Sequence, residues 1–143
     1  MSRPLPATPP AVPSTAAGLS GGLFCAAAGF QLALAAGAPW GAAAWGGAMP
    51  GVLPAGYRIA SVGSAAVLAG LGVALAGGIS APRSRRRLLT GALGFATLSA
   101  GMNLASPSLI ERAIWVPFAV VQIVALSQAR RSESRHASVV EVQ

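Results

Sequence analysis

Lysine and aspartate are absent from this chain of 143 residues, which has one cysteine, one histidine and three acidic side chains. Without aspartate, and with its single histidine, His136, in a C-terminal tail, the chain cannot assemble a Ser/His/Asp triad. A single cysteine, Cys25, excludes an intramolecular disulfide and a thiolate metal site, and we expect it to be a small apolar helix residue. The sequence therefore predicts a non-enzymatic protein without a metal or a cofactor.

Charge is also scarce, because 9% of the residues are charged and 54% are hydrophobic. Soluble globular proteins carry roughly a quarter of charged residues, so this composition indicates a membrane protein. The net charge of +7 comes from ten arginines, which cluster at the ends of apolar runs. A nucleic-acid partner is not expected, since a nucleic-acid-binding face needs basic residues on an exposed surface.

Four apolar segments predict an all-α membrane protein, a bundle of four transmembrane helices. They span about residues 19–38, 57–79, 88–105 and 113–129, within a transmembrane domain of residues 18–129. At ~1.5 Å per residue, each helix can cross roughly 30 Å of hydrocarbon. Residues 1–17 are rich in Pro and Ala and are expected to form a disordered cytoplasmic tail. Residues 130–143 are expected to form a second cytoplasmic tail, also disordered.

The arginines predict the orientation in the membrane. With both termini in the cytoplasm, eight arginines lie inside and two, Arg58 and Arg112, lie outside, as the positive-inside rule requires. This N-in/C-in topology suits a bacterial inner (plasma) membrane. The cluster RSRRR is expected to bind anionic lipid headgroups through Arg83, Arg85, Arg86 and Arg87. A cleavable signal peptide in place of the first span is the alternative interpretation.

Regularly spaced glycines predict how the helices pack. The second segment has glycines seven residues apart, and the third has two more at the same spacing: Gly56, Gly63, Gly70 and Gly77, then Gly94 and Gly101. Such stripes let helix backbones approach closely in lipid. They predict an antiparallel hairpin of the second and third helices, unless they merely reflect a Gly- and Ala-rich composition.

Two glutamines, Gln31 and Gln122, are the long polar side chains deep within the predicted spans. Counted from the predicted helix ends, they lie at similar depth near the midplane, so a hydrogen bond between helices 1 and 4 is expected. The alternative is a polar spot on a substrate path, together with Ser99 or Thr97.

The stretch SPSLIERAIW begins the fourth helix. Ser108 and Glu111 have the S-x-x-E spacing of a capping box; alternatively Ser106 is the cap and Pro107 the first helical residue. The functional alternative is an outward-facing ligand site in which Glu111 and Arg112 join Arg58 and Asn103.

The 18 residues PWGAAAWGGAMPGVLPAG connect the first two helices and hold three prolines and five glycines. We expect this loop to lie on the outer membrane surface with Trp40 and Trp45 in the interface, where amphipathic rings are favoured. A lid over a ligand is the alternative.

Two blocks of sequence, GAPWGAAAWGG with LPAGYRIAS downstream, and MNLASPSLIERAIWVP, resemble those of uncharacterised four-span integral membrane proteins of high-GC, actinobacteria-like bacteria. That family has no assigned activity. The resemblance implies a four-helix bundle and assigns no role to any residue.

Three functions follow as hypotheses. The leading one is a non-enzymatic interaction or structural subunit, acting by self-association or in a larger membrane complex. The second is a small transporter or channel component with a polar midplane at Gln31 and Gln122. The third is a membrane ligand-binding protein or enzyme whose site is the outer cluster around Glu111. A polar cavity reaching both glutamines favours transport, whereas a pocket beneath the loop that holds Glu111 and Arg58 favours the third.

Overall fold

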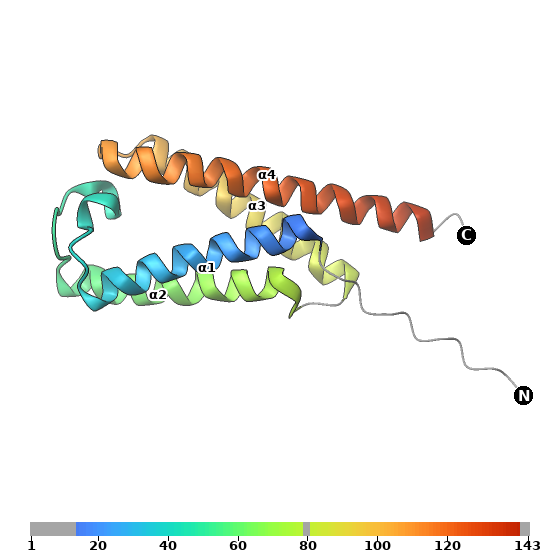
Figure 1. Cartoon of the computed structure of the whole chain (residues 1–143), viewed down its shortest axis with the longest axis horizontal. Helices are drawn as coiled ribbons and strands as arrows, with labels where there is room; N and C mark the ends of the chain where they lie inside the picture. The colour runs from blue at the N-terminus through green and yellow to red at the C-terminus, as the bar shows by residue number, and fades with distance from the viewer. Residues whose placement is uncertain (1–13, 79–80, 141–143) are drawn as a thin grey trace, which may run out of the picture.

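The computed structural model describes residues 14–78 and 81–140, which form four long helices (Figure 1). These are α1 (Thr15–Ala36), α2 (Ala55–Val73), α3 (Pro82–Leu104) and α4 (Leu109–Val140). The loop between α1 and α2 contains two short 3₁₀ helices, η1 (Gly41–Ala43) and η2 (Trp45–Gly47), and a π-helical turn, η3 (Ala74–Gly78), continues α2. The predicted all-helical fold is confirmed for the described residues.

Three of the four helices are long and apolar enough to cross a membrane: α1, α2 with most of η3, and α4 as far as Arg135. The chain is therefore a membrane protein by the length and composition of its helices. In α3 the first six residues include the four arginines of RSRRR, which leave a shorter apolar stretch behind them.

Local capping sets the limits of α1. The Ser14 hydroxyl accepts a hydrogen bond from the amide of Ala17 at 3.3 Å, and Gly37 ends the helix in the left-handed region at φ 102°. The helix thus begins four residues before the predicted start at residue 19. The prediction of a disordered tail is wrong for residues 15–17, which are helical, and residues 1–13 lie outside the described part of the chain.

Helix α4 is much longer than predicted, because it continues to Val140 rather than ending near residue 129. An ion pair at its far end, between Arg85 of α3 and Glu133, holds this extension against the start of α3. The prediction of a disordered tail is therefore wrong for residues 130–140.

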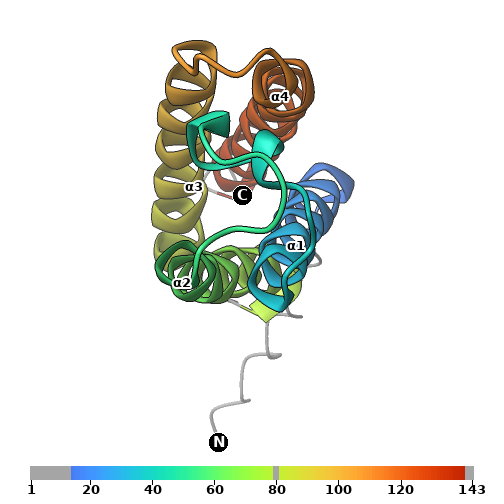
Figure 2. The ribbon, with the colours of Figure 1, turned by 90° about the vertical axis from the view of Figure 1, so that its left-hand side faces the viewer.

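The helices pair as α1 with α2 and α3 with α4, while α1 also packs on α4. Helix α3 starts beside η3 and then leans away from α2 towards the start of α4 (Figures 1 and 2). The predicted hairpin of α2 and α3 through their glycines is wrong. Gly63, Gly70, Gly94 and Gly101 are exposed, and a side chain added at any of them would project into open space.

Close backbone contact occurs instead between α1 and α2, at Gly21 and Gly72. A Cβ atom on Gly21 would lie 2.7 Å from the carbonyl oxygen of Gly72, and one on Gly72 would lie 2.8 Å from that of Gly21. These glycines stand outside the heptad stripe, which explains why the repeat did not reveal them.

Two apolar cores lie at different levels of the bundle. The larger one, termed the inner core, includes Phe24, Leu75, Leu89 and Leu126 and joins all four helices at the end where α3 begins. A smaller core of Leu34, Ala44 and Leu53 fixes the α1–α2 loop to the opposite end. The space between these two cores holds the candidate site.

The substitution Gly21→Ala tests the close contact. Because the added methyl group meets backbone on α2, we expect the protein in detergent to lose about 1–3 kcal/mol of stability, as overpacked sites do. Gly22→Ala is the matched control, since no atom lies within 4 Å of its added methyl group. The melting temperature followed by helical circular dichroism should fall for Gly21→Ala alone, and equal melting of the two variants would contradict the contact.

Candidate functional site

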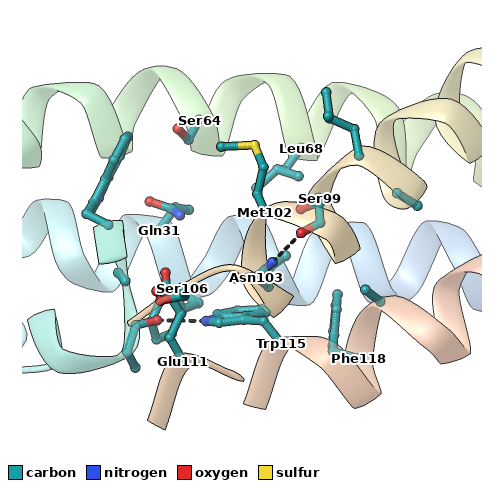
Figure 3. Close-up of a pocket in the computed structure, with 18 of the residues that line it drawn as sticks. Gln31, Ser64, Leu68, Ser99, Met102, Asn103, Ser106, Glu111, Trp115 and Phe118 are labelled. Carbon is teal, nitrogen blue, oxygen red and sulfur yellow. Dashed lines mark hydrogen bonds between the residues drawn. The ribbon is translucent and has the colours of Figure 1, made fainter. Parts of the chain in front are cut away.

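A cavity of about 1060 Å³ lies beneath the α1–α2 loop and is lined by all four helices (Figure 3). Gln31 of α1 and Ser64 of α2 face Ser99 of α3 and Trp115 of α4 across it. Ligand pockets typically measure roughly 300–1,000 Å³. This cavity is therefore large enough for a molecule of the size of a drug or a single-chain lipid.

The cavity opens sideways between α2 and α3. Val67 of α2 and Leu98 and Met102 of α3 line it and are 58%, 65% and 68% exposed. The lean of α3 away from α2 creates this opening, and its rim is apolar. In a bilayer an apolar opening in the side of a helix bundle faces lipid rather than water.

Towards the start of α3 the cavity ends on the inner core. Phe24 and Ala96 belong both to that core and to the cavity lining, with Leu75, Leu89 and Leu126 packed against the same cluster. In the described residues the cavity is thus closed at this end. This geometry suits a binding site better than a channel.

Aromatic side chains dominate the lining. Of the eight aromatic residues in the chain, all within the described part, seven line the cavity: Phe24, Phe30, Trp45, Tyr57, Phe95, Trp115 and Phe118. Several rings contact each other edge to face, including Phe30 with Trp115 at a centroid distance of 4.8 Å. The sequence predicted that Trp45 would sit at the membrane interface, but no sequence pattern indicated that Trp45, Tyr57 and Trp115 share a cavity.

The α1–α2 loop covers one end of the bundle (Figure 2) and is held there by the first turns of α4. The Ser108 hydroxyl donates to the Ala42 carbonyl at 2.8 Å, and Trp115 Nε1 donates to the Ala43 carbonyl at 2.7 Å. Gly46 takes a positive φ of 80°, and its amide donates to Glu111 Oε1 at 3.3 Å. The loop therefore covers the cavity, as a lid would, and the seating of Trp40 and Trp45 in the interface stays a prediction.

Helix α4 begins at Leu109, so the predicted alternative with Ser106 as the cap and Pro107 as the first helical residue is wrong. Ser108 precedes the helix and accepts from the Glu111 amide at 3.2 Å, as in a capping box. In a complete capping box the Glu111 carboxylate would also accept a hydrogen bond from the Ser108 amide, which it does not do here. Instead, the Ser106 hydroxyl links the Ser108 amide to the Glu111 carboxylate. It accepts from the Ser108 amide at 3.2 Å and donates to Glu111 Oε2. Glu111 is only 8% exposed and lines the cavity.

The predicted outer cluster is divided. Asn103 and Glu111 line the cavity, whereas Arg58 and Arg112 do not. Arg58 does not meet Glu111, because its Nε donates to the Ala35 carbonyl at 2.8 Å. The carbonyls of the last helical turn lack partners within the helix and attract cations, so the end of α1 takes this arginine.

Both glutamines line the cavity, but they do not bond to each other. Gln122 is 2% exposed, and its Nε2 donates to the Ser20 carbonyl of α1 at 3.2 Å. The predicted equal depth is wrong because α4 begins at Leu109, which places Gln122 about 20 Å from the loop end and Gln31 about 8 Å from it. Among the described atoms, Oε1 of each glutamine is buried without a hydrogen-bond partner.

The arginine cluster lies at the opposite end of the bundle. Arg85 is buried against Glu133, while Arg83, Arg86 and Arg87 are exposed. Arg85 therefore serves the contact of α3 with α4 rather than the surface.

No family model, curated protein or solved structure matches this chain. The resemblance to four-span actinobacterial proteins stays a prediction. Within residues 14–78 and 81–140, no group of three His, Cys, Asp or Glu side chains is placed to hold a metal ion.

Proposed function

We propose that this protein is a non-enzymatic, four-span protein of the inner membrane that binds one amphipathic molecule drawn from the bilayer. The observation that supports this proposal is the shape of the cavity: closed at one end, covered by a loop at the other, and open to the side between α2 and α3. A ligand can enter such a site from lipid without passing through water.

The polarity of the lining supports an amphipathic ligand. Ser106, Asn103 and Glu111 lie at the loop end, whereas Phe24, Leu68 and Phe95 form the apolar part near the inner core. A polar headgroup at the loop end and an apolar chain directed towards the inner core would meet matching surfaces. Pockets of this kind fix orientation through a few polar groups among apolar ones.

The proposed topology has α3 as a fourth span and both termini in the cytoplasm. The arginine asymmetry supports it, because the exposed Arg83, Arg86 and Arg87 lie at one end and the α1–α2 loop at the other. These three arginines would bind anionic headgroups on the inner side. The ligand site then lies in the outer half of the membrane.

Self-association or a place in a larger complex is the second candidate. The glycines of α2 and α3 are exposed rather than packed within the bundle, so a partner helix can approach them closely. Native mass spectrometry in mild detergent tests this candidate, since a particle with the mass of one chain would exclude self-association under those conditions.

The topology is tested by cysteine labelling of intact cells in a Cys25→Ser background. A membrane-impermeant maleimide should label Ala48→Cys in the loop directly, and Ser84→Cys in the arginine cluster only after permeabilisation. Both positions are exposed, so accessibility within the fold does not bias the result. Labelling of Ser84→Cys from outside would reverse the topology.

Ligand binding is tested with a neutral probe, bromododecanol, added to the protein in nanodiscs. Bromine quenches tryptophan fluorescence at short range, and Trp45 and Trp115 line the cavity. We expect quenching that saturates at a low mole fraction of probe in the bilayer. Saturation at a low mole fraction indicates that the probe occupies a site. Quenching by probe that is merely dissolved in the lipid increases steadily with the mole fraction of probe and does not level off in this range.

A pair of matched double variants locates the bound probe. Ser64→Phe with Ser99→Phe fills the cavity from α2 and α3 and should abolish the saturable quenching. Val62→Phe with Thr97→Phe places the same two phenyl rings on the same two helices at exposed positions outside this cavity, and should leave the quenching unchanged. Equal quenching in both double variants would overturn the proposed site.

A further inference from the structure

The cavity contains a carboxylate whose charge no described cation balances. Glu111 is 8% exposed, and its two oxygens accept from the Gly46 amide and the Ser106 hydroxyl, which are both neutral donors. None of the arginines that the structure describes lines the cavity, and the other described acid, Glu133, is paired with Arg85 at the far end. A buried ion without a counter-charge is costly, so a cationic ligand would gain from meeting it.

Aromatic rings near Glu111 favour the same charge. Trp115 follows Glu111 by one helical turn on α4, and Trp45 precedes Gly46, the residue whose amide contacts the carboxylate. Trp45 is also in edge contact with Tyr57 at a centroid distance of 5.7 Å. The faces of Trp and Tyr rings attract ammonium groups, most strongly where water is excluded.

The lining also contains a buried acceptor without a donor towards the loop end of the cavity. Oε1 of Gln31, about 8 Å from the loop end, is buried in the cavity lining and has no hydrogen-bond partner among the described residues. An ammonium group supplies donors and no acceptor. An anionic headgroup would face Glu111 without any described cation beside it.

We infer that the ligand is a lipophilic cation, a protonated amine on an apolar chain, whose ammonium group pairs with Glu111 beneath the loop. This inference rests on the proposed function, because it names the class of molecule that the same cavity binds. Glu111 serves two purposes in it: the carboxylate fixes the loop in place and binds the headgroup.

The experiment compares three probes with the same brominated twelve-carbon chain: bromododecylamine, bromododecanol and bromododecanoic acid. Each is added to the full chain in nanodiscs of zwitterionic lipid at neutral pH, and saturable tryptophan quenching is measured against the mole fraction of probe in the bilayer. We expect the amine to bind about tenfold or more tightly than the alcohol, as a charge-assisted hydrogen bond with a cation–π contact allows. The acid should bind more weakly than the alcohol.

Glu111→Gln keeps the shape of the side chain and removes its charge. It should abolish the preference for the amine over the alcohol, whereas Glu133→Gln, at the far end of the bundle, should keep the preference. Equal affinity of the wild-type protein for amine and alcohol would overturn the cationic ligand while leaving the binding cavity in place. If no probe gives saturable quenching, the proposed function itself fails. The comparison of probes on the wild-type protein decides between these outcomes even if Glu111→Gln unfolds.

Discussion

The contact between the α1–α2 loop and the first turns of α4 determines much of this structure. Ser108 and Trp115 donate to the adjacent carbonyls of Ala42 and Ala43, and Glu111 accepts from Gly46. Burying a polar group without a hydrogen-bond partner costs free energy. Here α4 supplies donors to the loop carbonyls, and the loop supplies an amide to the Glu111 carboxylate. The loop is thereby fixed over the cavity.

The cavity itself follows from how the helices pair. Gly21 and Gly72 bring α1 and α2 into backbone contact, and α3 packs on α4 and leans away from α2. The inner core closes the cavity at the arginine end, and α3 diverges from α2 towards the loop end of the bundle (Figure 1). A bundle packed along its whole length would have no such opening. We interpret the incomplete packing of α2 against α3 as the feature that admits a ligand from lipid.

The sequence predicted the features that depend on neighbouring residues. Apolar runs gave four helices, and the spacing of Ser108 and Glu111 gave the start of α4. Features that depend on distant residues were missed. Glycines seven apart show that a close approach is possible, but not whether a helix occupies the groove, and the stripes of α2 and α3 proved to be exposed. The depth of Gln122 was misjudged because it was counted from residue 113, where the apolar segment starts, and not from Leu109, where the capped helix begins.

The central claim, that α4 holds the loop over the cavity, is tested most directly by hydrogen exchange of the loop amides in Trp115→Phe. This change keeps an aromatic ring but removes the donor to Ala43. Leaving a buried carbonyl unpaired costs about 1–3 kcal/mol, so protection of the amides of Ala43, Ala44 and Gly47 should fall by roughly 5–30-fold or more. Trp40→Phe, at a 49% exposed tryptophan outside the cavity lining, should leave the protection unchanged. Equal protection in wild type and Trp115→Phe would contradict the account.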